Sequence, residues 1–114
     1  MPFINVYVSK DLNNQEITAV KSRLGKAISV FPGKSESYLM VNITPKCNLF
    51  FGGKNDKDCA VAEVKLFGGV VPQYSEKFTE EFCKIMQEEL KIAGDKTYVT
   101  YQGIENWGFN GRNF

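Results

Sequence analysis

The feature that most constrains the fold is a change in apolar spacing that occurs in the same order in both halves of the chain. In the first half, apolar residues alternate over 3–9, recur at helical spacing over about 14–31, and share one face again over 38–44. Asn13 and Glu16 have the spacing of a helix N-cap and its reciprocal partner. The first half therefore predicts a β-α-β unit.

The second half repeats the scheme. Residues 58–67 form a predicted strand, about 75–92 a helix, and 97–102 a second strand. Ser75 is expected to cap this helix and Gly94 to end it. The tail contains Asn110-Gly111, a dipeptide typical of type I′ hairpin turns.

Two such units predict an α+β fold in which a four-stranded mixed sheet carries two helices on one face, within a single domain, residues 1–114. The other face of the sheet would then be uncovered. Several of its expected residues are apolar or aromatic: Tyr38, Met40, Val61, Phe67 and Tyr98. Such a surface favours assembly, so an oligomer is expected.

Composition excludes several classes of site. The chain has no histidine, which removes Ser-His, Cys-His and His-metal designs. Its three cysteines lack zinc spacing and indicate a reducing, cytoplasmic origin, with no metal and no cofactor expected. A net charge of +1 gives no reason to expect nucleic acid. No apolar run approaches membrane-spanning length, so no transmembrane segment is expected. A signal peptide is not expected either, because the first residues lack a basic region and alternate between apolar and polar.

Pro2 is the candidate catalytic residue. An initiator methionine before a small residue is normally removed, which would leave a proline with a free secondary amine. A buried prolyl amine is a base that needs no histidine. The alternating run that follows would hold this terminus in a sheet, where a reactive group can be kept in place.

Six pieces of sequence, in order and spacing, resemble the macrophage migration inhibitory factor family and its relative D-dopachrome tautomerase, within the tautomerase superfamily. They are Met1-Pro2, Gly33-Lys34 with Tyr38, Asn48-Leu49-Phe50-Phe51-Gly52-Gly53, Gly68, Asp95-Lys96-Thr97-Tyr98-Val99, and Asn106-Trp107-Gly108-Phe109-Asn110-Gly111. The resemblance implies a homotrimer with an active site at each subunit boundary.

The same resemblance assigns roles to residues. It implies that Pro2 is catalytic and that the substrate is contacted by Lys34, Tyr38, Phe67, Tyr98, Thr100 and Phe109, with Tyr98 contributed by the neighbouring subunit. Phe67 replaces the usual isoleucine, whose backbone contacts substrate, and Thr100 replaces an asparagine. Trp107 and Phe109 can equally pack the C-terminal hairpin between subunits. Ala62 stands where a second cysteine would complete a Cys-x-x-Cys motif, so thiol–disulfide oxidoreductase activity is not expected.

The implied chemistry is keto–enol tautomerisation of a small aromatic α-keto acid or a dopachrome-like substrate. An α-amino group has a pKa of about 7.7–8.0, and burial beside Lys34 would lower it. Lys34 would also attract the substrate carboxylate. The alternatives are a cytokine-like ligand that binds a cell-surface receptor after release without a signal peptide, and a scaffold trimer with a vestigial pocket.

Overall fold

A four-stranded sheet organises the computed structural model, which describes residues 1–114. The main elements, in chain order, are β1 (Pro2–Val8), α1 (Asn14–Ala27), β2 (Met40–Thr44), β3 (Ala60–Phe67), α2 (Pro72–Ile85) and β4 (Thr97–Ile104). Short 3₁₀ turns occupy Ile28–Val30, Glu36–Tyr38 and Gly94–Lys96, and a π-helical turn Met86–Leu90 extends α2. The small strands β5 (Gly108–Phe109) and β6 (Arg112–Asn113) follow.

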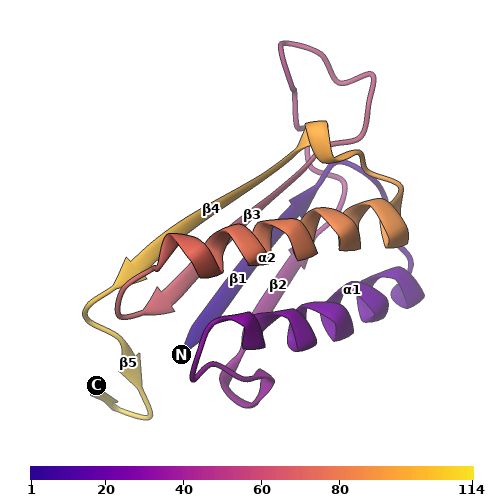
Figure 1. Ribbon diagram of the computed structural model, residues 1–114. Coiled ribbons are helices and arrows are strands. Elements are labelled where there is room, and N and C mark those ends of the chain that lie inside the picture. The colour runs from indigo at the N-terminus through magenta and orange to yellow at the C-terminus, as the bar shows by residue number, and fades with distance from the viewer.

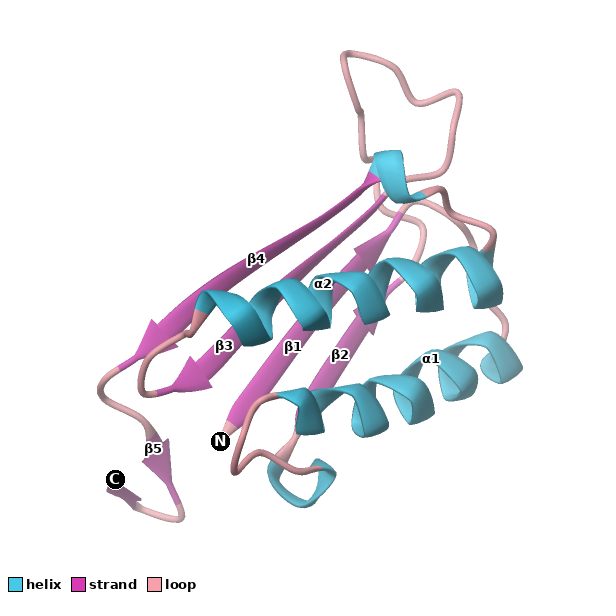
Figure 2. Ribbon diagram, in the orientation of Figure 1, coloured by secondary structure: helices cyan, strands magenta, loops and turns pink.

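The strand order is β2-β1-β3-β4. β1 pairs with β2 in parallel and β3 with β4 in parallel, while the central β1–β3 pair is antiparallel. Each parallel pair is joined through a helix, and both helices lie on the same face of the sheet (Figures 1 and 2). The predicted mixed sheet with two helices on one face is therefore confirmed.

The core lies between the sheet and the helices because each central strand presents alternate residues to them. Ile4, Val6 and Val8 of β1 are fully buried. On β3 the predicted inward face is likewise buried, and α2 contributes its apolar stripe: Ala60, Ala62, Val64 and Leu66, with Phe78, Phe82 and Ile85. The small alanines allow a helix to pack closely on the sheet.

The start of α1 is as predicted. The Asn13 side chain accepts the Glu16 N–H at 2.8 Å, and the Glu16 carboxylate accepts the Asn13 N–H at 3.0 Å. This reciprocal capping box satisfies two backbone donors that the first turn would otherwise leave unpaired.

Both predicted ends of the second helix were wrong. α2 begins at Pro72, whose fixed φ and missing N–H suit the first helical position, and Ser75 lies inside the first turn, where its hydroxyl donates to the Pro72 carbonyl at 3.1 Å. The helical segment ends at Lys91, which takes the left-handed conformation at φ 59°. Gly94 instead opens the 3₁₀ turn that precedes β4.

The uncovered face of the sheet is more polar than predicted. A row of polar residues crosses its centre in register, formed by Asn42, Asn5, Glu63 and Thr100. Exposed apolar residues lie on either side of that row, with Met40 at 68% exposure near one end of the sheet and Tyr98 at 61% near the other. Tyr38, also exposed, belongs to the 3₁₀ turn before β2 and not to a strand.

The C-terminal segment forms the predicted hairpin. Asn110 and Gly111 both have positive φ, 53° and 84°, as a type I′ turn requires. Figure 1 shows this hairpin beside the chain's N-terminus, at the end of the sheet opposite the long β2–β3 loop. None of the helices combines the length and apolar character needed to cross a bilayer.

Candidate active site

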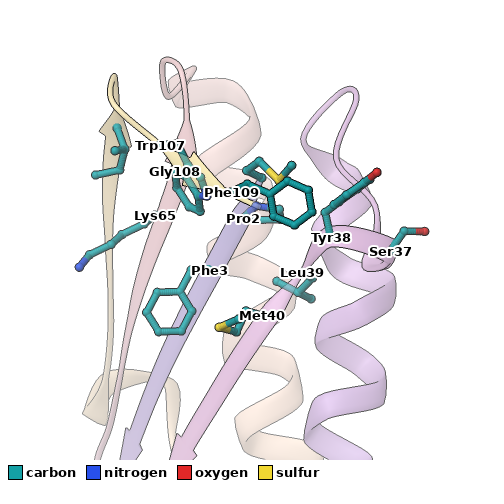
Figure 3. A pocket seen from close by; sticks show the side chains of 12 residues that line it. Pro2, Phe3, Ser37, Tyr38, Leu39, Met40, Lys65, Trp107, Gly108 and Phe109 are labelled. Carbon is teal, nitrogen blue, oxygen red and sulfur yellow. The ribbon is translucent and has the colours of Figure 1, made fainter. Parts of the chain in front are cut away.

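A cavity of about 650 Å³ opens where β1 begins (Figure 3). Its walls come from the N-terminus and the start of β1, the turn before β2 with the first residue of β2, one residue of β3, the last residue of β4, and the C-terminal segment. The lining residues are Met1, Pro2, Phe3, Ser37, Tyr38, Leu39, Met40, Lys65, Ile104, Trp107, Gly108 and Phe109. Most are apolar, and none is acidic.

Pro2 is buried at this cavity because β1 begins at that residue. It pairs with Leu66 on β3, and the Met1 carbonyl accepts the Phe67 N–H at 3.0 Å. The sheet ladder therefore continues to the first peptide bond. A proline fits there, since the first residue of a strand can lack an N–H.

Lys34 is the cation that acts on the N-terminal amine. Its ammonium donates to the Phe67 carbonyl at 3.2 Å. The pKa of the Met1 α-amine lies below its ordinary value of 8.0, first because of burial, then because of the Lys34 charge and a hydrogen bond with the Lys34 side chain. All three causes disfavour the protonated amine. The surroundings of the chain's end thus favour the neutral amine more than water does.

Aromatic rings form one wall of the cavity. Tyr38 and Phe109 meet edge to face with ring centroids 5.9 Å apart, and Phe109 stacks on Phe114 at 6.0 Å. Phe114 in turn contacts Phe67 at 5.5 Å, and its N–H donates to the Trp107 carbonyl at 3.0 Å. The C-terminal residue therefore links the hairpin to the end of β3.

Five of the seven predicted site residues lie together. Pro2, Tyr38 and Phe109 line the cavity, and Lys34 and Phe67 adjoin it through the hydrogen bond just described. Trp107 also lines it, so the hairpin residues contribute to the cavity within one chain.

Tyr98 and Thr100 lie elsewhere. Tyr98 pairs with Val61 and Pro2 with Leu66, so the two are separated by five residues of β3, roughly 17 Å at about 3.3 Å per residue. The Tyr98 ring packs on Phe51, with centroids 5.4 Å apart. Thr100 borders a separate depression. Neither residue reaches the cavity of its own chain.

Sequence reasoning missed three parts of the site: Phe3, Lys65 and Phe114. Phe3 alternates with Ile4 and so faces away from the helices, and Lys65 is its register partner across β1 and β3. The alternation could have identified Phe3, but Lys65 required the strand register. Phe114 required the path of the hairpin.

The structure offers no evident metal centre. No group of three or more Cys, Asp or Glu side chains is placed to hold an ion. The three cysteines are free, and burial raises the pKa of the Cys83 thiol. The chemistry available at the cavity is that of an amine, an ammonium and aromatic surface.

Comparison with known proteins identifies the family of the chain. The sequence model of the family described as macrophage migration inhibitory factor matches residues 1–114. The macrophage migration inhibitory factor homolog of Brugia malayi is 32% identical over 113 residues, covering 95% of this chain and 97% of that protein. The Mus musculus factor is 26% identical over 95 residues, 82% of each chain.

A solved structure gives the same result for the fold. The crystal structure of Leishmania major MIF2 superposes with a TM-score of 0.92 and 26% identity, covering 100% of this chain and 97% of that one. The family match spans the whole sequence, and the strand order and both helices agree with the expected fold. The chain belongs to the macrophage migration inhibitory factor family.

Proposed function

We propose that this protein is a keto–enol tautomerase for aryl 2-oxo acids of the phenylpyruvate type or for dopachrome-like substrates. Its general base would be the secondary amine of Pro2, freed by removal of Met1. The observation that carries the proposal is the position of the N-terminus: Met1 and the buried Pro2 line a largely apolar cavity, and burial and the Lys34 charge lower the pKa of the Met1 amine.

The base must be neutral near pH 7 to accept a proton. The Met1 amine already has a lowered pKa, and loss of Met1 would place the terminal nitrogen one residue further along β1, at buried Pro2. Apolar walls and the Lys34 charge act in the same direction on that nitrogen. A chain that retains Met1 has an amide at Pro2, which is not a base.

The reaction then needs few groups. The Pro2 nitrogen takes a proton from the carbon next to the substrate carbonyl, the C–H electron pair forms the new C=C bond, and the carbonyl π pair moves to oxygen. The Pro2 ammonium then gives a proton, directly or through water, to that oxygen, which completes the enol and restores the neutral amine. The Lys34 ammonium would bind the substrate carboxylate, and the aromatic wall at Tyr38 and Phe109 would hold the ring.

Tyr98 and Thr100 fit this proposal only in an assembly. Because Tyr98 lies at the far end of the sheet in its own chain, it would act in the cavity of a neighbouring chain. We extend the proposal to a homotrimer with its sites at the subunit boundaries, supported by the exposed Met40 and Tyr98 on the uncovered face. The protein would be cytoplasmic, with release that needs no signal peptide.

Replacing the base tests the mechanism. Pro2→Gly keeps a free terminal amine but removes the secondary amine, and should lower phenylpyruvate turnover by about 10²-fold, at the low end of general-base contributions. Enol absorbance measures the rate, and intact mass verifies that Met1 is absent. Pro45→Ala, after β2 and away from the cavity, is the control. Unchanged turnover in Pro2→Gly would reject Pro2 as the base.

A receptor-binding role is the second candidate. It is favoured by family membership and by large apolar side chains outside the cavity, such as Phe50 at 64% exposure. In that case the cavity would be vestigial, consistent with Phe67 and Thr100 at altered positions. Binding to cell-surface receptors that persists in Pro2→Gly would support a separate signalling surface, whereas binding that is lost with turnover would contradict it.

A further inference from the structure

The cavity has a second cation that the proposed chemistry does not use. Lys65 lines it from β3, where it stands between Phe3 of β1 and Gln102 of β4 in the strand register. Figure 3 shows its side chain extending away from Tyr38, so that the ammonium lies at the margin of the cavity. A monocarboxylate bound at Lys34 would not require this charge.

The two lysines reach different positions along β3. Lys34 is bound to the Phe67 carbonyl, and Lys65 is two residues earlier on β3, about 7 Å along the strand. Apolar side chains, including Phe3 and Met40, line the space around Lys65. The cavity thus combines a cation near the N-terminus, apolar surface, and a second cation at its margin.

No acidic partner neutralises Lys65. Glu63 is the nearest candidate, because it lies on the same face of β3 two residues earlier and borders the small depression that shares Lys65 as a wall. No ion pair joins the two side chains, and the cavity lining contains no acidic residue. A half-buried lysine that borders an apolar cavity and has no counter-ion is suited to an anionic ligand group.

We propose that the preferred substrate is an aryl 2-oxo acid with a second anionic group at the end remote from its keto carboxylate, and that Lys65 selects for this group. The inference rests on the proposed function and refines its substrate class. Lys34 would bind the keto carboxylate, the apolar walls would hold the ring, and Lys65 would pair with the distal anion.

The test uses a matched substrate series: phenylpyruvate, 4-methylphenylpyruvate and 4-carboxyphenylpyruvate. The wild-type protein should show a higher kcat/KM for the carboxylated compound than for the methylated one, which has similar bulk. Lys65→Met, which keeps the stem and removes the charge, should reduce that ratio about tenfold, as loss of a charged hydrogen bond does. Lys21→Met, on the exposed surface of α1, should leave the ratio unchanged.

The inference is overturned if Lys65→Met lowers kcat/KM equally for all three substrates, because the lysine would then act as a general anion attractor. An unchanged ratio also overturns it. A binding measurement separates it from the proposed function. Trp107 is the only tryptophan and lines the cavity, so its fluorescence can report binding of 3-phenylpropanoate and its 4-carboxy derivative, neither of which enolises.

If turnover is absent but Lys65→Met weakens only the 4-carboxy ligand, the tautomerase proposal fails and the distal-anion site stands. If turnover depends on Pro2 while both ligands bind Lys65→Met as they bind the wild type, the distal-anion site fails and the tautomerase proposal stands.

Discussion

The Lys34 ammonium donates a hydrogen bond to the backbone carbonyl of Phe67 at 3.2 Å. The N–H of the same residue is held by the Met1 carbonyl at 3.0 Å, so both polar groups of Phe67 connect to the cavity. The bonds involve only the backbone of Phe67. Its departure from the family's isoleucine therefore leaves the placement of Lys34 intact, and its ring is free to contact Phe114.

Lys34→Met should move the pH dependence of turnover upward. The active base is the neutral amine, so kcat/KM rises as pH increases through the amine pKa. Lys34 contributes to the lowering of the terminal amine pKa, and its removal should return that pKa toward the ordinary value. A pH series of kcat/KM with phenylpyruvate measures the shift of the midpoint. KM should also rise, because the substrate carboxylate loses its partner. Lys54→Met, remote from the cavity, is the matched control; an unmoved midpoint in Lys34→Met would contradict the electrostatic coupling.

Gly103→Ala should destabilise the end of the sheet that carries the site. A Cβ at Gly103 would collide with the Gly68 carbonyl oxygen and come within 3.4 Å of its carbonyl carbon. Gly68 follows Phe67, and its N–H is bonded to the Ile104 carbonyl at 2.9 Å. The strain should cost about 1–3 kcal/mol in urea unfolding and raise KM by displacing the Phe67 carbonyl.

Gly94→Ala provides the comparison, because nothing lies within 4 Å of a Cβ built there and its φ is not positive. It should unfold at nearly the wild-type urea concentration. Equal stabilities for the two variants would show that the sheet end adjusts to the added methyl group without cost.

The sequence predicted those parts of the fold that depend on residues close to one another in the chain. The alternation in β1 and β3, the Asn13–Glu16 capping box and the Asn110-Gly111 turn each involve residues close in sequence. The predicted ends of α2 were wrong, although helix ends also depend on residues close in sequence. Ser75 has a good capping side chain, but Pro72 starts the helix one turn earlier, and Lys91 adopts a left-handed conformation that a glycine would be expected to take.

Apart from Pro2, the site residues were predicted only through the family resemblance. Composition and spacing suggested Pro2, but the proximity of Lys34 to the N-terminus depends on a loop that returns to β3. Lys65 enters the cavity because of a β1–β3 register that no short window of sequence encodes. For Tyr98 the difficulty is different. The strand pattern places it on β4, but its proposed role in the site needs a second chain.

Tyr101 offers a test of how β4 is joined to α2. Its hydroxyl donates to the Ser75 carbonyl at 2.8 Å and lies 2.7 Å from the Thr79 hydroxyl, so it bonds to the first two turns of that helix. Burial raises its pKa to about 12, with the nearby Cys83 acting in the same direction and the Thr79 hydrogen bond opposing them. Folding therefore keeps the phenol protonated above its ordinary pKa of 10.0.

Tyr101→Phe should lower the free energy of unfolding at pH 7 by about 1–2 kcal/mol, because two polar groups lose a partner. Between the unfolded pKa of 10.0 and the folded value of about 12, the folded state retains a proton that the unfolded chain loses, so this tyrosine's contribution to stability falls as pH rises. Phenolate absorbance should show a late step near pH 12 that Tyr101→Phe lacks. Tyr74→Phe, on α2 with no hydrogen bond at its hydroxyl, should retain that step and lose little stability; equal losses would mean that the Tyr101 hydroxyl does not join strand to helix.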